Sequence, residues 1–213
     1  MIITYQGAEF FKIQQGETTL AFNPISKDSK LKSARFGADV VFSTVHHADM
    51  NGVEQMTFGE KKPIVISGPG EYETQGIFVK GFSSLSHYGG KELLNTMYFL
   101  TLDGMNLCFL GAIDTTEISK EAIAAVDDID ILFVPIGGDG VLSPADAYKM
   151  AVKLEAKLII PMHYGEIGEE GSLKKFLKEG GAEEVKAEEK LTLKKKDLDG
   201  KEGEIAVLKS QTA

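Results

Sequence analysis

Histidines follow two of the apolar runs that are typical of buried strands. His47 lies shortly after the run Asp39–Thr44, and His163 comes directly after the run Leu158–Met162. Side chains just beyond the carboxyl ends of strands commonly line the ligand sites of α/β proteins. Two imidazoles and the carboxylate of Asp49 are the minimum set for a catalytic zinc or a similar divalent ion. The spacing therefore predicts a metal site built from these three side chains.

The same residues allow a second interpretation. The chain contains neither an HxH nor an HExxH pair, which are the spacings that place two histidines on one ion. The histidines could instead be loop residues whose imidazoles form hydrogen bonds with nearby groups. Spacing alone leaves both interpretations open.

The elements that must position these residues change in type along the chain. The first half predicts mainly strands, and the second half alternates short helices with strands. Sheets packed on each other with helices outside them are the arrangement that suits this order. The predicted strands are Ile2–Tyr5, Phe10–Gln14, Thr18–Phe22, Asp39–Thr44, Pro63–Ser67, Ile77–Gly81, Asn95–Leu102, Leu107–Leu110, Ile129–Pro135, Leu158–Met162, Leu191–Leu193 and Ile205–Leu208. The predicted helices are Ser119–Val126, a helix that starts after Ser143, and Ser172–Lys178. The charged turn over 194–204 is expected to form a solvated hairpin between the last two strands.

Composition limits the classes of partner. The 213 residues predict a single domain over 1–213, and 43% hydrophobic and 26% charged residues are ordinary for a soluble globular protein. The net charge of −9 disfavours nucleic acid and anionic membrane surfaces as main partners. No apolar run approaches the roughly 18 residues that span a bilayer. Cys108 is the one cysteine, so no internal disulfide can form and a cytoplasmic location is expected.

Five stretches, in order along the chain, carry a resemblance to a known family. They are Ile3–Gly7 with Leu20–Pro24, Ala38–Asp49, Leu107–Gly111, Phe133–Gly138 and Ile160–Gly165. Together they resemble the metallo-β-lactamase superfamily, and within it the branch of metal-dependent hydrolases that includes ascorbate-6-phosphate lactonase. The resemblance implies an αββα four-layer sandwich, an α/β fold. It also implies hydrolysis of a small ester, lactone or phosphodiester by a metal-bound water.

Several positions depart from that family's metal-binding pattern. The pattern T-H-x-H-x-D-H aligns on Thr44, and its first and third histidines fall on Val45 and Met50. The bridging aspartate falls on Ala112, and the family's D-P turn is Asn23-Pro24. Valine, methionine and alanine offer no donor suited to zinc, so a dinuclear centre is not expected. An asparagine in place of aspartate is expected where a structural hydrogen bond outlives the metal.

The resemblance carries over three ligands cleanly, namely His47, Asp49 and His163. His87 and Asp114 are further candidate ligands that would need a shift of one or two residues from the family's positions. Asp49 and His163 would also be the catalytic residues of an active enzyme. The cofactor would be one divalent metal, zinc or manganese, or no metal at all.

Two functions from different classes follow from this site. One is a metal-dependent hydrolase, mononuclear if active, that acts on a small molecule. The other is a non-catalytic descendant that uses the old active-site pocket for ligand binding or regulation. Nuclease activity is disfavoured by the acidic balance, and a homo-oligomer is expected only through the resemblance.

Overall fold

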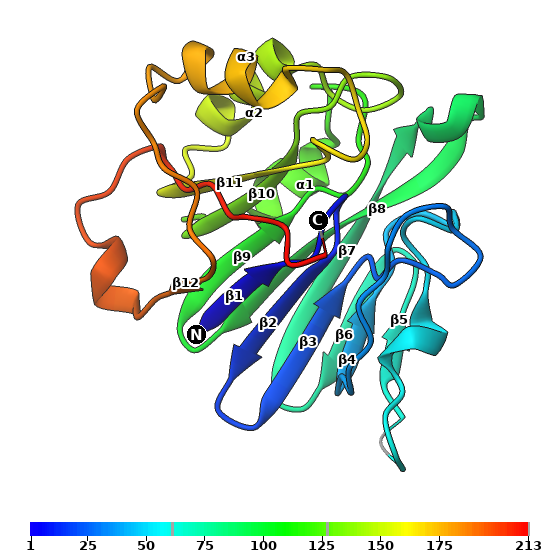
Figure 1. Cartoon of the computed structure of the whole chain (residues 1–213). Helices are drawn as coiled ribbons and strands as arrows, with labels where there is room; N and C mark the ends of the chain where they lie inside the picture. Colours follow the sequence, from blue (N-terminus) through cyan, green and yellow to red (C-terminus); the bar gives the residue numbers. More distant parts are fainter. Residues whose placement is uncertain (61, 127, 213) are drawn as a thin grey trace.

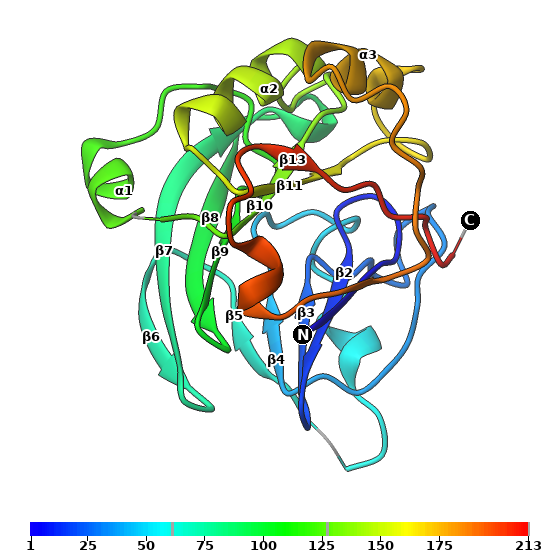
Figure 2. The same cartoon turned by 90° about the vertical axis from the view of Figure 1, so that its left-hand side faces the viewer.

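The protein folds into two β-sheets packed face to face, as seen in a computed structural model that describes residues 1–60, 62–126 and 128–212 (Figures 1 and 2). We call them sheet A and sheet B. In spatial order, sheet A contains β12 (Leu191–Thr192), β1 (Ile2–Tyr5), β2 (Phe11–Gln15), β3 (Thr18–Phe22), β4 (Val40–Phe42) and β5 (Ile64–Ile66). Sheet B contains β13 (Glu204–Ile205), β11 (Leu158–Met162), β10 (Ile131–Pro135), β9 (Met105–Phe109), β8 (Leu93–Leu102), β7 (Ile77–Ser86) and β6 (Gly70–Thr74).

The main core lies between the two sheets. Side chains alternate along each strand, so every second residue of sheets A and B faces this core. Stacked aromatic rings contribute to this core. The ring centroid of Phe22 in β3 lies 4.4 Å from that of Phe42 in the neighbouring strand β4, and 4.8 Å from that of Phe109 in β9 of sheet B. All five residues of both β10 and β11 are buried, as expected for central parallel strands covered on both faces.

The outer face of sheet B is covered by helices. Helices α1 (Lys120–Ala125), α2 (Pro144–Lys153) and α3 (Ser172–Glu179) contribute to a second apolar cluster with this face. Helix α2 begins as the sequence predicts, with the Ser143 hydroxyl accepting from the Asp146 amide and Pro144 in the first turn.

The outer face of sheet A is covered differently. The 3-10 helix η1 (Val53–Met56) and the long connection from β3 to β4, residues 23–39, pack there around Ala21 and Val41. These segments form the fourth layer, and the predicted metallo-β-lactamase sandwich is confirmed. Among the described residues, no helix has both the length and the apolar character needed to cross a lipid bilayer.

The C-terminal tail corrects one expectation. Its two short strands do not form a hairpin across the charged turn, because β12 pairs with β1 and β13 pairs with β11. The turn contains the 3-10 helix η3 (Lys195–Leu198), and Lys195 forms an ion pair with buried Asp130. The tail therefore wraps across the edges of both sheets.

Candidate functional site

His163 is held by a carboxylate that comes from the other sheet. It follows the end of β11, while Glu9 lies in the turn between β1 and β2, and both side chains are fully buried. Glu9 Oε1 lies 2.7 Å from His163 Nδ1. The backbones also meet, since the His163 amide donates to the carbonyl of Ala8 at 2.6 Å. Both His163 and Ala8 have positive φ angles, 62° and 53°, which are strained for residues with a Cβ.

The other ring nitrogen of His163 has no partner. Among the described residues, Nε2 of His163 is the one buried side-chain nitrogen or oxygen without a hydrogen bond. An unsatisfied buried polar atom costs about 1–3 kcal/mol. A histidine whose Nδ1 is oriented by a carboxylate and whose Nε2 is free has the arrangement of a metal ligand.

An asparagine ties this pair to sheet A. The side-chain amide of Asn23 donates to Glu9 Oε2 and to the Thr44 hydroxyl, each at 2.8 Å. Its carbonyl accepts from the Thr44 backbone amide, also at 2.8 Å. Asn23 thus makes the structural hydrogen bonds expected of it, with Glu9 and Thr44 as its partners.

Tyr88 lies between the two candidate histidine ligands. It belongs to the 3-10 turn η2 (Tyr88–Gly90) at the tip of the β7–β8 hairpin. Its ring packs edge to face with those of His47 and His163, with ring centroids 4.9 Å apart in both cases. Burial and the hydrogen bond to Asp49 raise the pKa of the Tyr88 hydroxyl well above its usual value. The tyrosine therefore remains a protonated donor.

Both oxygens of Asp49 are already engaged. Tyr88 donates to Asp49 Oδ2 at 2.7 Å, and the Ser29 hydroxyl donates to Asp49 Oδ1. The Asp49 amide in turn donates to Nδ1 of His47 at 3.2 Å. The turn after β4 therefore does bring His47 and Asp49 together, and protein groups donate to Nδ1 of His47 and to both oxygens of Asp49.

Apolar side chains fill the space beside this network. Val45, Met50, Ala112 and Val141 form a buried cluster, with Tyr88 and Leu93 packed against it. The first three are at most 2% exposed. This part of the site is therefore buried hydrophobic core.

His87 and Asp114 form a separate pair. The His87 side chain is 54% exposed, and its Nδ1 forms a hydrogen bond with Asp114. The hydrogen bond and charge of Asp114 raise the pKa of the His87 imidazole. Among the described residues, no group of three or more His, Cys, Asp or Glu side chains is arranged to hold a metal ion.

Two residues at this site were not predicted from the sequence. Glu9 had a signal, since it is the one charged residue among the apolar side chains around the first turn, in Gly7–Phe11. Tyr88 had no such signal beyond its place in a glycine-rich loop, because its contacts depend on the position of the hairpin tip relative to the other sheet.

Comparison with known proteins identifies the family. A family model described as a beta-lactamase superfamily domain matches residues 2–163. The chain belongs to the metallo-β-lactamase superfamily. A UPF0173 metal-dependent hydrolase from Anoxybacillus flavithermus is 25% identical over 194 residues, covering 77% of this chain and 86% of the relative. A UPF0173 metal-dependent hydrolase from Listeria innocua is 42% identical over only 65 residues, or 30% of this chain and 28% of that relative.

Solved structures agree on the fold of this superfamily member. A crystal structure from Thermotoga maritima, described as a candidate Zn-dependent hydrolase of the metallo-β-lactamase superfamily, superposes with a TM-score of 0.73. The match covers 98% of this chain and 99% of that one at 23% sequence identity. The relatives' names support a divalent metal in the family.

The residues of this family member do not fit a two-metal centre. The sequence resemblance predicts the first and third histidines and the bridging aspartate at Val45, Met50 and Ala112, and these three residues belong to the apolar cluster. Among the predicted ligands that remain, Asp49 accepts a hydrogen bond at each of its two oxygens. The ring of Tyr88 packs against the imidazoles of both His47 and His163. The free Nε2 of His163 still suits a metal.

Proposed function

We propose that this chain is a non-catalytic member of its superfamily, which retains the sandwich as a scaffold for binding. The observation that carries the proposal is the packing of Val45, Met50 and Ala112 into one apolar cluster. A metal-bound water needs a metal held by several N, O or S donors. Three donors have been replaced together here, and the space they would share is filled.

The polar groups that remain support the same proposal. Glu9 and Asp49 each use both oxygens within the protein. These groups stabilise the junction of the two sheets, so their retention is explained without catalysis. Because the interior is filled, binding would use the exposed loops around the former active site.

The test is a hydrolysis screen with esters, lactones and phosphodiesters, run with and without added zinc or manganese. We expect no turnover above the buffer blank for the wild-type protein. Turnover that a chelator abolishes and that His163→Ala also removes would overturn the proposal.

A hydrolase with a single metal ion is the second candidate, and the free Nε2 of buried His163 favours it. In that case His47, Asp49 and His163 would hold one zinc or manganese ion, and Asp49 and His163 would be catalytic. His87 and Asp114, which contact each other, are the further candidate ligands. This candidate requires Tyr88 to leave its place between the imidazoles, so it predicts more activity in Tyr88→Ala than in wild type.

Both candidates share the remaining expectations. A small molecule is the ligand class that the fold suits, and the acidic net charge disfavours nucleic acid. The lone buried Cys108 requires no oxidising compartment, which supports a cytoplasmic protein. We treat residues 1–213 as a single domain, since the C-terminal tail pairs with both sheets.

A further inference from the structure

Two loops of opposite charge lie next to each other at the end of the sandwich that carries the site. The first, residues 27–35, is part of the connection from β3 to β4, and we call it the basic loop. The second, residues 164–171, connects His163 to α3, and we call it the acidic loop. Neither contains a position that aligns with a metal ligand of the family.

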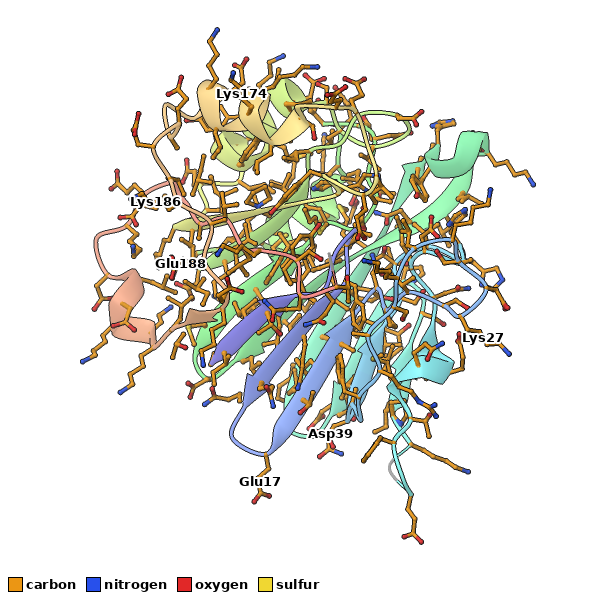
Figure 3. All side chains as sticks on the ribbon, viewed as in Figure 1. Glu17, Lys27, Asp39, Lys174, Lys186 and Glu188 are labelled. Atoms are coloured by element: carbon orange, nitrogen blue, oxygen red, sulfur yellow. The ribbon has the colours of Figure 1, made fainter. Side chains whose placement is uncertain are left out.

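The basic loop contrasts with the rest of the chain. Its exposed side chains include four cations and one acid, Asp28, so the loop has a net charge of +3, whereas the whole protein has a net charge of −9. The four cations are Lys27, Lys30, Lys32 and Arg35. Arg35 is the only arginine in the sequence. Figure 3 shows Lys27 projecting outward from this loop. In the described parts of the chain, these cations form no ion pair within 4 Å, whereas several other lysines do, and the charge of Lys27 helps to lower the pKa of the nearby Glu54 carboxyl.

The basic loop is also an ordered part of the molecule. The connection that contains it, residues 23–39, has no helix or strand, and connections longer than about 12–15 residues without either are usually functional or disordered. Hydrogen bonds fix its course: the Ser33 hydroxyl donates to the Ile25 carbonyl at 2.5 Å, and Ser26 donates to Glu54 at 2.7 Å. An ordered loop can present its charges in a fixed pattern.

The acidic loop carries the matching charge. Glu166, Glu169 and Glu170 are exposed and give it a net charge of −3. Only Glu169 has an ion-pair partner among the described residues, the exposed Lys175 at 3.4 Å. Exposed pairs of this kind contribute little, so the loop's charge remains available to a partner.

Apolar side chains connect the two loops. Leu31 of the basic loop and Ile167 of the acidic loop pack against the same buried cluster, which includes Phe10 and Ile25. Both residues are only partly buried, so apolar surface remains between the two sets of charges. An apolar centre with a charged rim is the usual anatomy of a protein interface.

We propose that this face binds a second copy of the chain. A two-fold axis that runs between the two loops places the basic loop of each copy opposite the acidic loop of the other, so that charges of +3 and −3 meet twice. A polyanion such as RNA fits less well, because the adjacent acidic loop and the net charge would repel it. At physiological salt the Debye length is about 8 Å, so contacts across the interface outweigh repulsion between distant charges.

The test measures the mass of the full chain in solution by analytical ultracentrifugation. The wild type should dimerise at 0.1 M salt and dissociate at 1 M, where the Debye length falls from about 10 Å to about 3 Å. Lys30→Glu/Lys32→Glu and Glu166→Lys/Glu170→Lys should each weaken the dimer at least about 100-fold, because like charges then face each other. An equimolar mixture of the two variants should form a heterodimer, since both contacts are again between opposite charges.

Matched controls carry the same charge changes elsewhere. Lys186→Glu/Lys190→Glu and Glu183→Lys/Glu184→Lys alter exposed side chains, and Lys186 lies on the far side of the molecule from Lys27 (Figure 3). They should leave the dimer unchanged. A wild type that stays monomeric at low salt, reversals that leave the dimer intact, or variants that fail to pair when mixed would each overturn the proposal. These readouts do not depend on metal content or hydrolysis, so the proposed function can fail without affecting them.

Discussion

The hydroxyl of Tyr88 donates a hydrogen bond to Asp49, with 2.7 Å between Oη and Oδ2. Tyr88 comes from the β7–β8 hairpin of sheet B, and Asp49 follows β4 of sheet A. Asp49 is one of the metal ligands that the sequence resemblance predicts, and here the neutral phenol of Tyr88 donates to one of its oxygens. This hydrogen bond links the two sheets through the tip of one hairpin.

The first prediction concerns the stability that Tyr88 provides. Tyr88→Phe removes a hydrogen bond to a carboxylate and should lower the free energy of unfolding by about 1–2 kcal/mol. Tyr88→Ala also removes the ring between His47 and His163 and should cost about 2–4 kcal/mol. Urea denaturation measures both values. Tyr72→Phe is the control, because the Tyr72 hydroxyl donates only to backbone carbonyls at Gly68 and Pro69 and its loss should cost less. A Tyr88→Phe variant as stable as wild type would contradict the structural role of this hydrogen bond.

The second prediction concerns Glu9. Its two oxygens accept from His163 and Asn23, and all three side chains are fully buried. Glu9→Ala leaves His163 Nδ1 and one N–H of the Asn23 amide without a partner and should destabilise the fold by about 3–5 kcal/mol. Glu9→Gln keeps the shape and should cost about 1–3 kcal/mol. Chemical denaturation decides the matter, and the exposed Glu17→Ala control should change stability by less than about 0.5 kcal/mol. Equal stability of Glu9→Ala and Glu17→Ala would contradict this assignment.

Much of the fold can be read from local patterns. The apolar runs at 131–135 and 158–162 predict central strands because both of their faces are buried, and the structure has strands there. Asn23 is another success, since the exchange of the aspartate of the family's D-P turn for a neutral amide indicated a structural hydrogen bond. These predictions depend on chemistry close in sequence to the residues concerned.

The failures involve contacts between distant segments. Tyr88 reaches Asp49 only because the ten-residue strands β7 and β8 extend far enough to carry the hairpin tip over the site. The tail was expected as a hairpin, yet its strands find unpaired edges on two different sheets. The local conformational preferences of residues do not determine contacts between such distant segments, so sequence patterns could not predict them.

The third prediction restores the missing ligands. A variant with Val45→His, Met50→His, Ala112→Asp and Tyr88→Ala regains three donors and loses the ring between the imidazoles. It should be less stable than wild type without metal, because it buries polar groups without partners. Zinc at 100 times its Kd should then stabilise it by about 2.7 kcal/mol. Thermal unfolding with and without zinc measures this, and the same variant with Tyr88 retained is the control. A similar zinc effect on the wild type would contradict the account.

The fourth prediction concerns pH and Asp130. Burial of this carboxyl would raise its pKa, but hydrogen bonds from Lys195, the Asn106 amide and Lys157 outweigh burial and lower the pKa below its usual value. A carboxyl with a lowered pKa in the folded state stabilises the fold above the unfolded value, about 3.9. That contribution is lost as the pH falls through the folded pKa. Asp130→Asn should therefore be less stable than wild type at pH 7, with a gap that closes below about pH 4. Denaturation across a pH series is the measurement, and a gap that does not change with pH would refute this role.

The loss of the two-metal centre is the central claim, and metal content tests it most directly. Elemental mass spectrometry would be applied to untagged protein purified without chelator, with His47→Ala/His163→Ala as the matched variant. Because three donor positions are occupied by Val45, Met50 and Ala112, we predict far less than one equivalent of zinc, manganese or iron in both proteins. One or two equivalents in the wild type that disappear in the double variant would contradict the account.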